Sequence, residues 1–508
     1  MVEISKAFNE IESIVGSKNI TDKDFMKAAY SRNVDPAFPD RYADMIVRPK
    51  TTEEISNIVK IANKYKIPIV PRGGGADLVG GAATEGGILM DLTRMNQIIE
   101  INEKDFYCVV ECGITWGKLL SELSKRGLCT GVIGPGSGYS ATIGGGLSNS
   151  TAGFGSTKYG LVPDICLGVE VVLPNPQGSI IRTGAAVSRY AKPFCRYGEA
   201  PDFTGLFMGD VGTMGIKTEA FLKLFPLAPI KAFRSYMLKK NDLNKVSQLM
   251  NKFRKELSDG LQDLYINPLP VVRLLSTLAE KKPPRRARLK GPVFEIFLEA
   301  FDERIMEVYL EKVDDIMKND ARPFEWQEID LAAKLSTEWQ FNLNFSYSYF
   351  NKFIALAPPK ISCVTCHKLP ISAIAEKEKA SIDFDNSHMG EFPEQSFSLF
   401  ARSIHLLPNG NCVCAGGFNA ENRNDQRDIA MDLWHKKLRF QAKYGGIHYW
   451  LGESISQSIV ESGAYTPDFA QFFKDIKRVV DPNYILSPNK FHMYNYEDDI
   501  TKYLVKDE

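Results

Sequence analysis

Apolar residues in the first part of the chain follow first a helical and then a strand-like spacing. Thr51 and Glu54 have the form of a capping box, and the apolar positions after them repeat at helical spacing through Lys66. The run Ile67–Val70 is short, apolar and followed by a proline, which predicts a buried strand. Further elements are expected as strands over 88–92 and 107–111 and as a helix over 116–126. The first 225 residues are therefore predicted to be an α+β unit with tight glycine turns.

The pattern changes from about Lys231 onward. Helical spacing now alternates with strand-like runs, with helices expected over 242–256 and 302–318 and strands over 293–298, 361–369 and 397–407. This predicts a second α+β domain of similar size. Within it, the basic stretch Lys281–Lys290 is interrupted by prolines, which indicates either a solvated loop or a docking patch for an acidic redox partner.

The composition narrows the class of protein. The 508 residues include 62 Lys and Arg against 62 Asp and Glu, so the formal charge is zero. This balance argues against nucleic acid as a partner, because phosphate binding needs a net basic face. The N-terminal residues lack the basic start of a signal peptide, no apolar run is long enough for a membrane span, and nine cysteines are too sparse for a disulfide scaffold. We therefore expect a cytoplasmic protein without a membrane span.

The strongest local signal is the run Pro71-Arg72-Gly73-Gly74-Gly75-Ala76-Asp77, which directly follows a predicted strand. Consecutive glycines let the backbone turn through positive φ and approach a ligand closely. Successive backbone N–H groups in such a turn can form an anion-binding concavity. The run therefore predicts either a diphosphate-binding loop or a tight connection without a ligand.

Further glycine motifs follow this loop along the chain. They are Gly134–Ser137, Thr142–Gly146, Gly153, Thr204–Phe207 and Gly209–Ile216, and a last motif lies over 481–490. In order and spacing they resemble the FAD-binding domain named after p-cresol methylhydroxylase, which defines the vanillyl-alcohol-oxidase superfamily. Several ordered motifs are far more specific than one glycine cluster.

The resemblance implies an α+β fold with a two-part FAD-binding domain over 1–228, a cap domain over 229–445, and a C-terminal segment over 446–508 that returns to the FAD-binding domain. The loop over 71–77 would hold the diphosphate, the motifs over 135–145 would line the isoalloxazine and ribityl groups, and Gly153 would lie close to the ring. The residues implied in FAD binding are Pro71, Arg72, Gly73, Gly74, Gly75, Ala76, Asp77, Pro135, Gly136, Ser137, Thr142, Ile143, Gly144, Gly145, Ser148, Gly153, Gly212, Ile216 (through its main chain, at the adenine half) and Asn489.

Gly75 departs from the pattern of relatives that tether FAD through this loop, which carry His at this position. Glycine has no nucleophile, so we expect FAD not to be covalently attached here. A tether from the cap domain remains open.

The cap must select the substrate carbon that gives up a hydride. One branch of the superfamily oxidises 2-hydroxy acids and holds a metal through two His flanking Gly-Asp-Gly-Asn and a later Glu-His pair. The matching stretch His405–Val413 keeps Gly410 and Asn411, but His405 is displaced by one position and Val413 replaces the second His. A catalytic metal normally needs three protein donors, so we expect no metal.

The other branch oxidises para-substituted phenols and places Tyr-Arg near the flavin. His448 and Tyr449 fall at the comparable positions. A phenol and an imidazole can polarise or deprotonate a substrate oxygen, although core packing would also explain both residues. Arg402 suits a substrate carboxylate or a surface ion pair. His367 is the fourth catalytic candidate.

The string Cys363–His367 matches a c-type haem attachment motif. We interpret the match as coincidence, because haem attachment belongs to exported proteins and the segment alternates as a strand does. We also find no cysteine cluster typical of an iron–sulphur centre. Electrons would therefore leave to oxygen, a quinone or a carrier protein.

The sequence therefore predicts an FAD-dependent dehydrogenase or oxidase acting on a small molecule, either a 2-hydroxy acid or an alcohol or hydroxylated aromatic. Two other functions stay open. One is a non-redox transferase of the alkyl-dihydroxyacetone-phosphate synthase type, disfavoured because no adjacent histidines occur. The other is a flavin-binding protein without catalysis. A protein electron acceptor and a homo-oligomer are open as partners.

Overall fold

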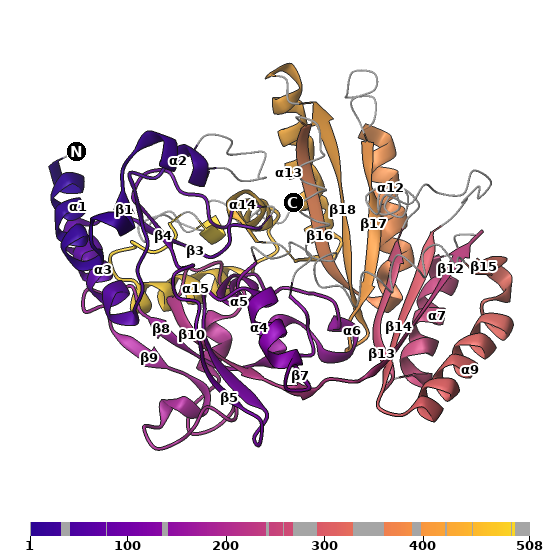
Figure 1. Cartoon of the computed structure of the whole chain (residues 1–508). Coiled ribbons are helices and arrows are strands. Elements are labelled where there is room, and N and C mark those ends of the chain that lie inside the picture. Colours follow the sequence, from indigo (N-terminus) through magenta and orange to yellow (C-terminus); the bar gives the residue numbers. More distant parts are fainter. Residues whose placement is uncertain are drawn as a thin grey trace.

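The computed structural model describes residues 2–31, 41–77, 79–134, 141–239, 243–257, 259–267, 292–328, 360–388, 398–421, 424–449, 451–488 and 490–492. Figure 1 shows an N-terminal unit with two sheets beside a larger sheet built from the later part of the chain. We call the first part the N-terminal unit (β1 to β11 with their helices) and the second the cap sheet (β12 to β19). The basic stretch Lys281–Lys290 lies outside the described residues.

The first sheet of the N-terminal unit has four strands, in the order β1-β2-β4-β3. Its strands are β1 (Ile20–Thr21), β2 (Met45–Val47), β3 (Ile69–Arg72) and β4 (Ile88–Asp91), and its helices are α1 (Val2–Val15), α2 (Asp24–Ser31) and α3 (Thr52–Tyr65). Strands β2, β4 and β3 are parallel. The predicted N-cap is present, because the Thr51 side chain accepts a hydrogen bond from the Glu54 N–H. The Glu54 carboxylate accepts from the Lys50 N–H instead of that of Thr51, so the capping box is only half formed.

The second sheet has five antiparallel strands, in the order β5-β6-β10-β8-β9. They are β5 (Ile98–Asn102), β6 (Tyr107–Glu111), β8 (Cys166–Val172), β9 (Ile180–Arg182) and β10 (Ile216–Lys223). Helices α4 (Trp116–Ser124), α5 (Ile143–Ser148) and α6 (Ser156–Tyr159) accompany it, and β7 (Leu128–Cys129) pairs with β11 (Phe225–Pro226). Its core includes the fully buried Trp116 and Phe207.

The cap sheet has eight antiparallel strands, in the order β15-β12-β14-β13-β17-β18-β16-β19. They are β12 (Ile230–Leu238), β13 (Leu261–Asn267), β14 (Val293–Ala300), β15 (Trp326–Glu328), β16 (Lys360–Pro370), β17 (Ser398–Leu406), β18 (Asn411–Glu421) and β19 (Ile447–His448). Helices α7 (Leu243–Glu256), α9 (Glu303–Asn319), α12 (Ile374–His388) and α13 (Asn424–Lys443) belong to the same part of the chain.

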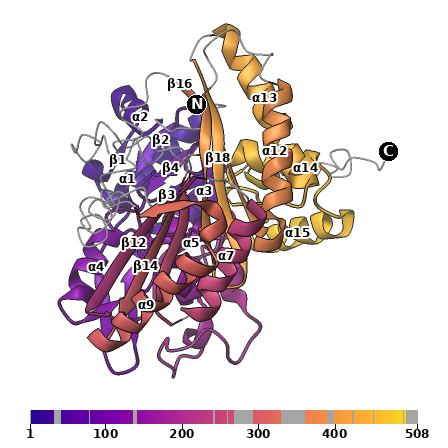
Figure 2. The same cartoon turned by 90° about the vertical axis from the view of Figure 1, so that its right-hand side faces the viewer.

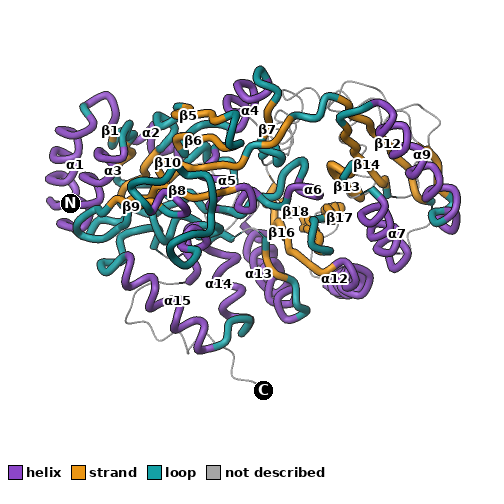
Figure 3. Tube along the Cα trace, turned by 90° about the horizontal axis from the view of Figure 1, so that it is seen from below, coloured by secondary structure: helices purple, strands orange, loops and turns teal. Residues whose placement is uncertain are grey.

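These four helices cover one face of the cap sheet, which we call the outer face (Figures 2 and 3). Residues of α7, α9 and α12 form one apolar core with alternate residues of β13, β14, β17 and β18. The opposite, inner face packs on the N-terminal unit, where Cys366, Val413 and Tyr449 form a cluster with Ala152 and Leu161. Because side chains alternate along a strand, neighbouring residues of each cap strand belong to different faces.

The last helices, α14 (Glu453–Glu461) and α15 (Pro467–Val480), lead the chain back to the N-terminal unit. The Ile69 N–H donates to the Ile485 carbonyl, and the Ser487 N–H donates to the Ile69 carbonyl, so this segment adds a parallel bridge beside β3. The buried Lys477 ammonium donates to Asp481 (2.6 Å) and to the carbonyls of Thr213 and Leu486.

Short 3-10 helices complete the chain, at Ser17–Asn19, Val162–Ile165, Gly184–Val187, Phe203–Phe207, Arg322–Phe324, Ile371–Ala373 and Lys490–His492. The helices and strands expected from the pattern of apolar positions are present, with ends that differ by one or two residues. In the described part of the chain, every helix is too short or too polar to cross a lipid bilayer.

The Lys477–Asp481 pair gives a first prediction. Its side chains are 1% and 0% exposed, so removing the carboxylate leaves a buried cation. We expect Asp481→Ala to lower the free energy of unfolding by about 3–5 kcal/mol, measured by urea denaturation. Asp432→Ala is the matched control, since Asp432 and Lys436 form an i,i+4 pair whose side chains are 57% and 44% exposed. That control should lose no more than about 0.5 kcal/mol, and equal losses in both variants would contradict the interpretation.

Candidate functional site

The glycines after β3 lie where a side chain would clash with neighbouring atoms. A Cβ placed on Gly73 would lie 2.2 Å from the Thr142 hydroxyl oxygen, and one on Gly75 would lie 2.2 Å from the Arg72 guanidinium carbon. Gly75 also has φ +62°, in the left-handed region that favours glycine. The Arg72 guanidinium lies 5.1 Å from the ring centroid of Tyr30. The run 71–77 therefore presents main chain, with Arg72 folded over it.

The second glycine motif lies directly against the first. Thr142 is the N-cap of α5, and its hydroxyl accepts from the Gly145 N–H at 3.3 Å. Gly144 rests on the buried Cys112, where a Cβ would lie 2.9 Å from the cysteine Cβ. Two motifs far apart in the sequence thus form one surface of nearly bare backbone.

The main chain at Gly153 also packs closely against another segment, that of Gly134. A Cβ on this residue would lie 2.1 Å from the Gly134 carbonyl oxygen, and the Ile133 N–H donates to the Phe154 carbonyl at 2.8 Å. The expected cofactor residues Pro135, Gly136 and Ser137 follow this contact but lie outside the described residues, as does Asn489.

The motif before β10 is organised by a buried carboxylate. Asp210 accepts from the Gly212 N–H at 3.1 Å and from the Lys217 ammonium at 2.7 Å. Lys217 also donates to the hydroxyl of Ser148 at 2.9 Å, so this expected cofactor residue supports the loop through its side chain. Ile216 opens β10 with its side chain fully buried in the core of the first sheet, which leaves only its main chain for a ligand.

These contacts agree with the requirements of a dinucleotide. A diphosphate needs close approach to main-chain N–H groups, and the runs 71–77 and 142–146 supply adjoining stretches where a Cβ would clash or strain the chain. The residues present therefore fit FAD.

Tyr449 reaches the N-terminal unit from the inner face. Its hydroxyl accepts a hydrogen bond from the Ala152 N–H, next to Gly153. Burial raises the pKa of Tyr449 well above its usual value, so the phenol is neutral. Tyr449 therefore fixes the segment that the resemblance places beside the flavin ring.

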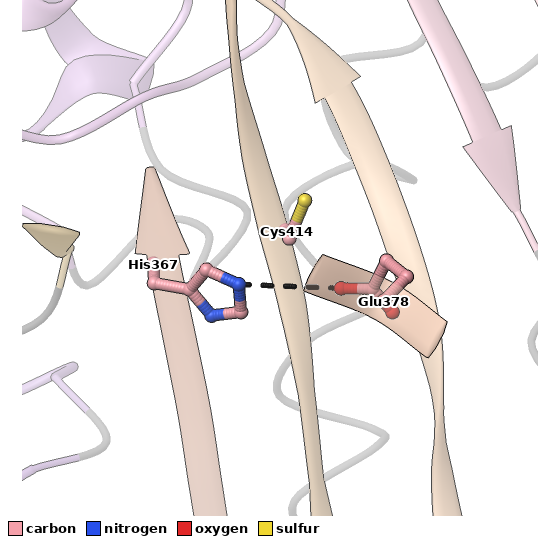
Figure 4. Close-up of side chains that lie close together, drawn as sticks. All are labelled: His367, Glu378 and Cys414. Atoms are coloured by element: carbon pink, nitrogen blue, oxygen red, sulfur yellow. Dashed lines mark ion pairs between the residues drawn. The ribbon is translucent and has the colours of Figure 1, made fainter. Parts of the chain in front are cut away.

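His367 and His448 lie on the outer face. They are cross-strand neighbours in β16 and β19. The His367 Nε2 is 4.0 Å from a carboxylate oxygen of Glu378 in α12 (Figure 4). His448 has a hydrogen bond to the Leu438 backbone in α13, and burial lowers its pKa to about 4. The catalytic candidates are thus divided between the two faces of the sheet. Arg402 belongs to β17, but its side chain lies outside the described residues.

The two cysteines of the haem-like motif Cys363–His367 also lie on different faces of the sheet. The Cys363 thiol approaches the Ala430 carbonyl of α13 on the outer face, whereas Cys366 belongs to the inner-face cluster. Because the two thiols lie on opposite faces, a single haem cannot bridge them.

Sequence reasoning did not find a polar row on the inner face. The Ser403 hydroxyl donates to the side-chain Oδ1 of Asn267 at 2.8 Å, and the side-chain Nδ2 of Asn267 donates to the Glu295 carboxyl group at 2.6 Å. Asn267 and Glu295 are buried, whereas Ser403 is half-buried. The row leads from the half-buried Ser403 to a carboxyl group in the interior.

A second inner-face group ties the cap sheet to the N-terminal unit. Asp263 accepts from the Gly155 N–H at 2.7 Å and from the His405 Nε2 at 2.6 Å. The ring of Tyr265 stacks on His405 with centroids 4.1 Å apart. His405, which the sequence suggested as a displaced metal ligand, is therefore engaged by a carboxylate.

Glu295 gives a prediction about pH. Burial raises the pKa of its carboxyl from 4.5 to about 7, against a lowering effect of Asn267. Between these values the folded protein keeps a proton that the unfolded chain loses, so stability falls as pH rises through this window and the cost is complete above it.

We expect Glu295→Gln to stabilise the protein at about pH 8, by up to about 3 kcal/mol, with no gain at about pH 4. Urea denaturation across this range measures the difference. Glu307→Gln, at an exposed position of α9, is the matched control and should show no such trend. A gain independent of pH would contradict the assignment.

Comparison with known proteins identifies the N-terminal unit. Residues 43–184 match the family model of the FAD binding domain. Glycolate oxidase subunit GlcD of Bacillus subtilis is 37% identical over 218 residues, which cover 43% of this chain and 44% of that protein. Against several such curated relatives, the chain spans about half of their length.

Some matches extend over the cap sheet as well. Alkyldihydroxyacetonephosphate synthase of Dictyostelium discoideum is 31% identical, over 88% of this chain and 73% of that protein. The structure of 4-ethylphenol oxidase from Gulosibacter chungangensis has a TM-score of 0.80 at 18% identity, over 97% of this chain and 98% of that one. The expected α+β fold is therefore confirmed, and the chain belongs to the vanillyl-alcohol-oxidase superfamily of FAD-binding proteins, with FAD as its cofactor.

Proposed function

We propose that this protein is an FAD-dependent oxidoreductase that removes a hydride from a carbon next to, or conjugated with, oxygen. The proposal rests chiefly on one contact: Tyr449 of the cap sheet holds the Ala152 main chain, beside Gly153. A substrate placed between this segment and the inner face would lie between the cofactor and the polar row. FAD, when bound, supplies the two-electron acceptor.

The inner-face residues have distinct parts in this proposal. Ser403 uses its hydrogen to bond Asn267, so its oxygen lone pairs can accept a hydrogen bond from a substrate hydroxyl. Glu295 accepts from the Asn267 amide and so fixes which end of that amide faces Ser403. Tyr449 closes the contact between cap sheet and N-terminal unit, which excludes water from one side of the site.

Matched proteins support oxidation at carbon next to oxygen. Among them are a glycolate oxidase subunit, D-lactate dehydrogenases and a 4-ethylphenol oxidase. The substrate is accordingly proposed to be a 2-hydroxy acid or a hydroxylated aromatic or alcohol. The electron acceptor is proposed to be external to this chain.

A second candidate function is a non-redox reaction at FAD. It is favoured by the 31% identity to alkyldihydroxyacetonephosphate synthase over 88% of this chain. Anaerobic mixing separates the two functions. An oxidoreductase bleaches its flavin when it meets its substrate, whereas net transfer leaves the flavin oxidised.

We expect one class in a panel of 2-hydroxy acids and para-alkylphenols to bleach the flavin. Tyr449→Phe should slow this reduction about fivefold, because it removes one positioning hydrogen bond of about 1 kcal/mol. Tyr444→Phe is the matched control, since this phenol is exposed at the end of α13 and lies over Lys377. Stopped-flow absorbance measures the rate. Reduction of Tyr449→Phe at the native rate, with equal FAD content, would contradict the role of Tyr449.

The loop around Gly75 gives a separate prediction. Because Gly75 has no side chain and Arg72 occupies the adjacent space, we expect no flavin to be covalently bonded to this peptide. Mass spectrometry of a proteolytic digest should find the peptide containing residues 72–77 at its unmodified mass. A flavin adduct on that peptide would overturn the assignment, whatever is found in the cap.

A further inference from the structure

The outer face of the cap sheet carries a cluster of four residues, of three types that can bind metal ions. His367 in β16 is the direct cross-strand partner of Cys414 in β18, and Cys412 precedes it by two residues on the same face. Glu378 approaches from α12 (Figure 4). All four side chains are buried, in a region otherwise formed by the apolar core of the cap.

The spacing of the donor atoms suits a small metal ion. The Cys412 and Cys414 sulfurs are 3.7 Å apart. Two sulfurs bound to one tetrahedral Zn²⁺ at about 2.3 Å each lie about 3.8 Å apart. The donor atoms of His367, Glu378 and Cys414 all lie within 4.8 Å of one another, and the His367 Nε2 is 4.0 Å from the Glu378 oxygen. A distance of 4.0 Å is too long for a hydrogen bond. If the imidazole nitrogen and the carboxylate oxygen moved toward each other by about 0.5 Å, both could bind the same ion.

The donor chemistry restricts which ion fits. Two thiols, an imidazole and a carboxylate are ligands of Zn²⁺ and similar transition metals, whereas Mg²⁺ and Ca²⁺ prefer oxygen alone. Three donors, those of His367, Glu378 and Cys414, already lie together, and the sulfur of Cys412 beside Cys414 would move toward them as the fourth. Four protein donors would fill a tetrahedral site and leave no position for substrate, which is typical of a structural ion. An ion would also compensate the cost of placing ionisable groups inside an apolar core.

We propose that His367, Glu378, Cys412 and Cys414 bind a structural Zn²⁺ that joins α12 to strands β16 and β18. Binding forms four metal–ligand bonds, and the two thiol protons leave to solvent. The site lies on the face opposite Tyr449 and does not use His405 or Val413, the positions on which we based the expectation of no metal, although Cys412 lies between them in the sequence. The Cys-X-Cys spacing in β18 was its only signal in the sequence.

The test begins with the metal content of purified full-length holoprotein. After dialysis against buffer containing Zn²⁺ and then metal-free buffer, elemental analysis should find about one zinc per chain. Cys414→Ser and Glu378→Gln should each lower the affinity for zinc at least tenfold, measured by competition with a chromogenic chelator. Cys108→Ser is the matched control, since Cys108 is a buried thiol in β6 of the N-terminal unit, and it should keep the metal.

A spectroscopic measurement covers the case in which a variant does not fold. Wild-type protein loaded with Co²⁺ should show the long-wavelength visible bands of a tetrahedral cobalt site, beyond the absorption of flavin. Wild-type protein that binds neither Zn²⁺ nor Co²⁺, octahedral cobalt spectra, or equal zinc in Cys414→Ser and Cys108→Ser would each overturn the proposal. FAD content and flavin reduction report separately on the proposed function.

Discussion

The cofactor site depends on how closely two stretches of main chain approach each other. The loop after β3 lies against the start of α5 because Gly73 has no Cβ to meet the Thr142 hydroxyl. Any side chain there would push apart the two sheets of the N-terminal unit, since β3 belongs to one and α5 packs on β10 of the other. The same close approach exposes main-chain N–H groups to a ligand, so packing and cofactor binding have one cause.

The cap sheet separates two tasks by its faces. Its inner face carries a row of polar groups and the aromatic residues that contact the N-terminal unit, whereas its outer face holds the apolar core and its helices. Adjacent residues of one strand can therefore serve unrelated purposes. Cys366 and His367 are neighbours in β16, yet one packs beside Tyr449 and the other points toward Glu378.

The sequence predicted the local elements and the cofactor better than the chemistry of the cap. Strand β3 and the N-cap at Thr51 follow from local apolar spacing and from one side chain, and both are present. The glycine motifs identified FAD because their order along the chain carries the information. In the cap, the alternation of β16 indicated a strand, but it could not indicate which face meets the flavin.

The polar row was not predictable because its members come from three strands. Ser403, Asn267 and Glu295 meet only when β13 lies between β14 and β17. That order is not the order of the strands along the chain, and no local pattern encodes it. His448 and Tyr449 are separated for a different reason: they are adjacent in the sequence, and the alternation of side chains along the strand directs them to opposite faces.

The return of the chain end to β3 bears on when the protein can fold during synthesis. Lys490 donates to the Gly80 carbonyl, 410 residues earlier in the sequence. The parallel bridge at Ile69 likewise needs Leu486 from the same C-terminal segment. A growing chain on the ribosome thus completes its first sheet only after the segment Ile485–Ser487 has been translated. Until then the outer edge of β3 has unpaired backbone groups, and this edge is where a stalled or shortened chain would associate with others.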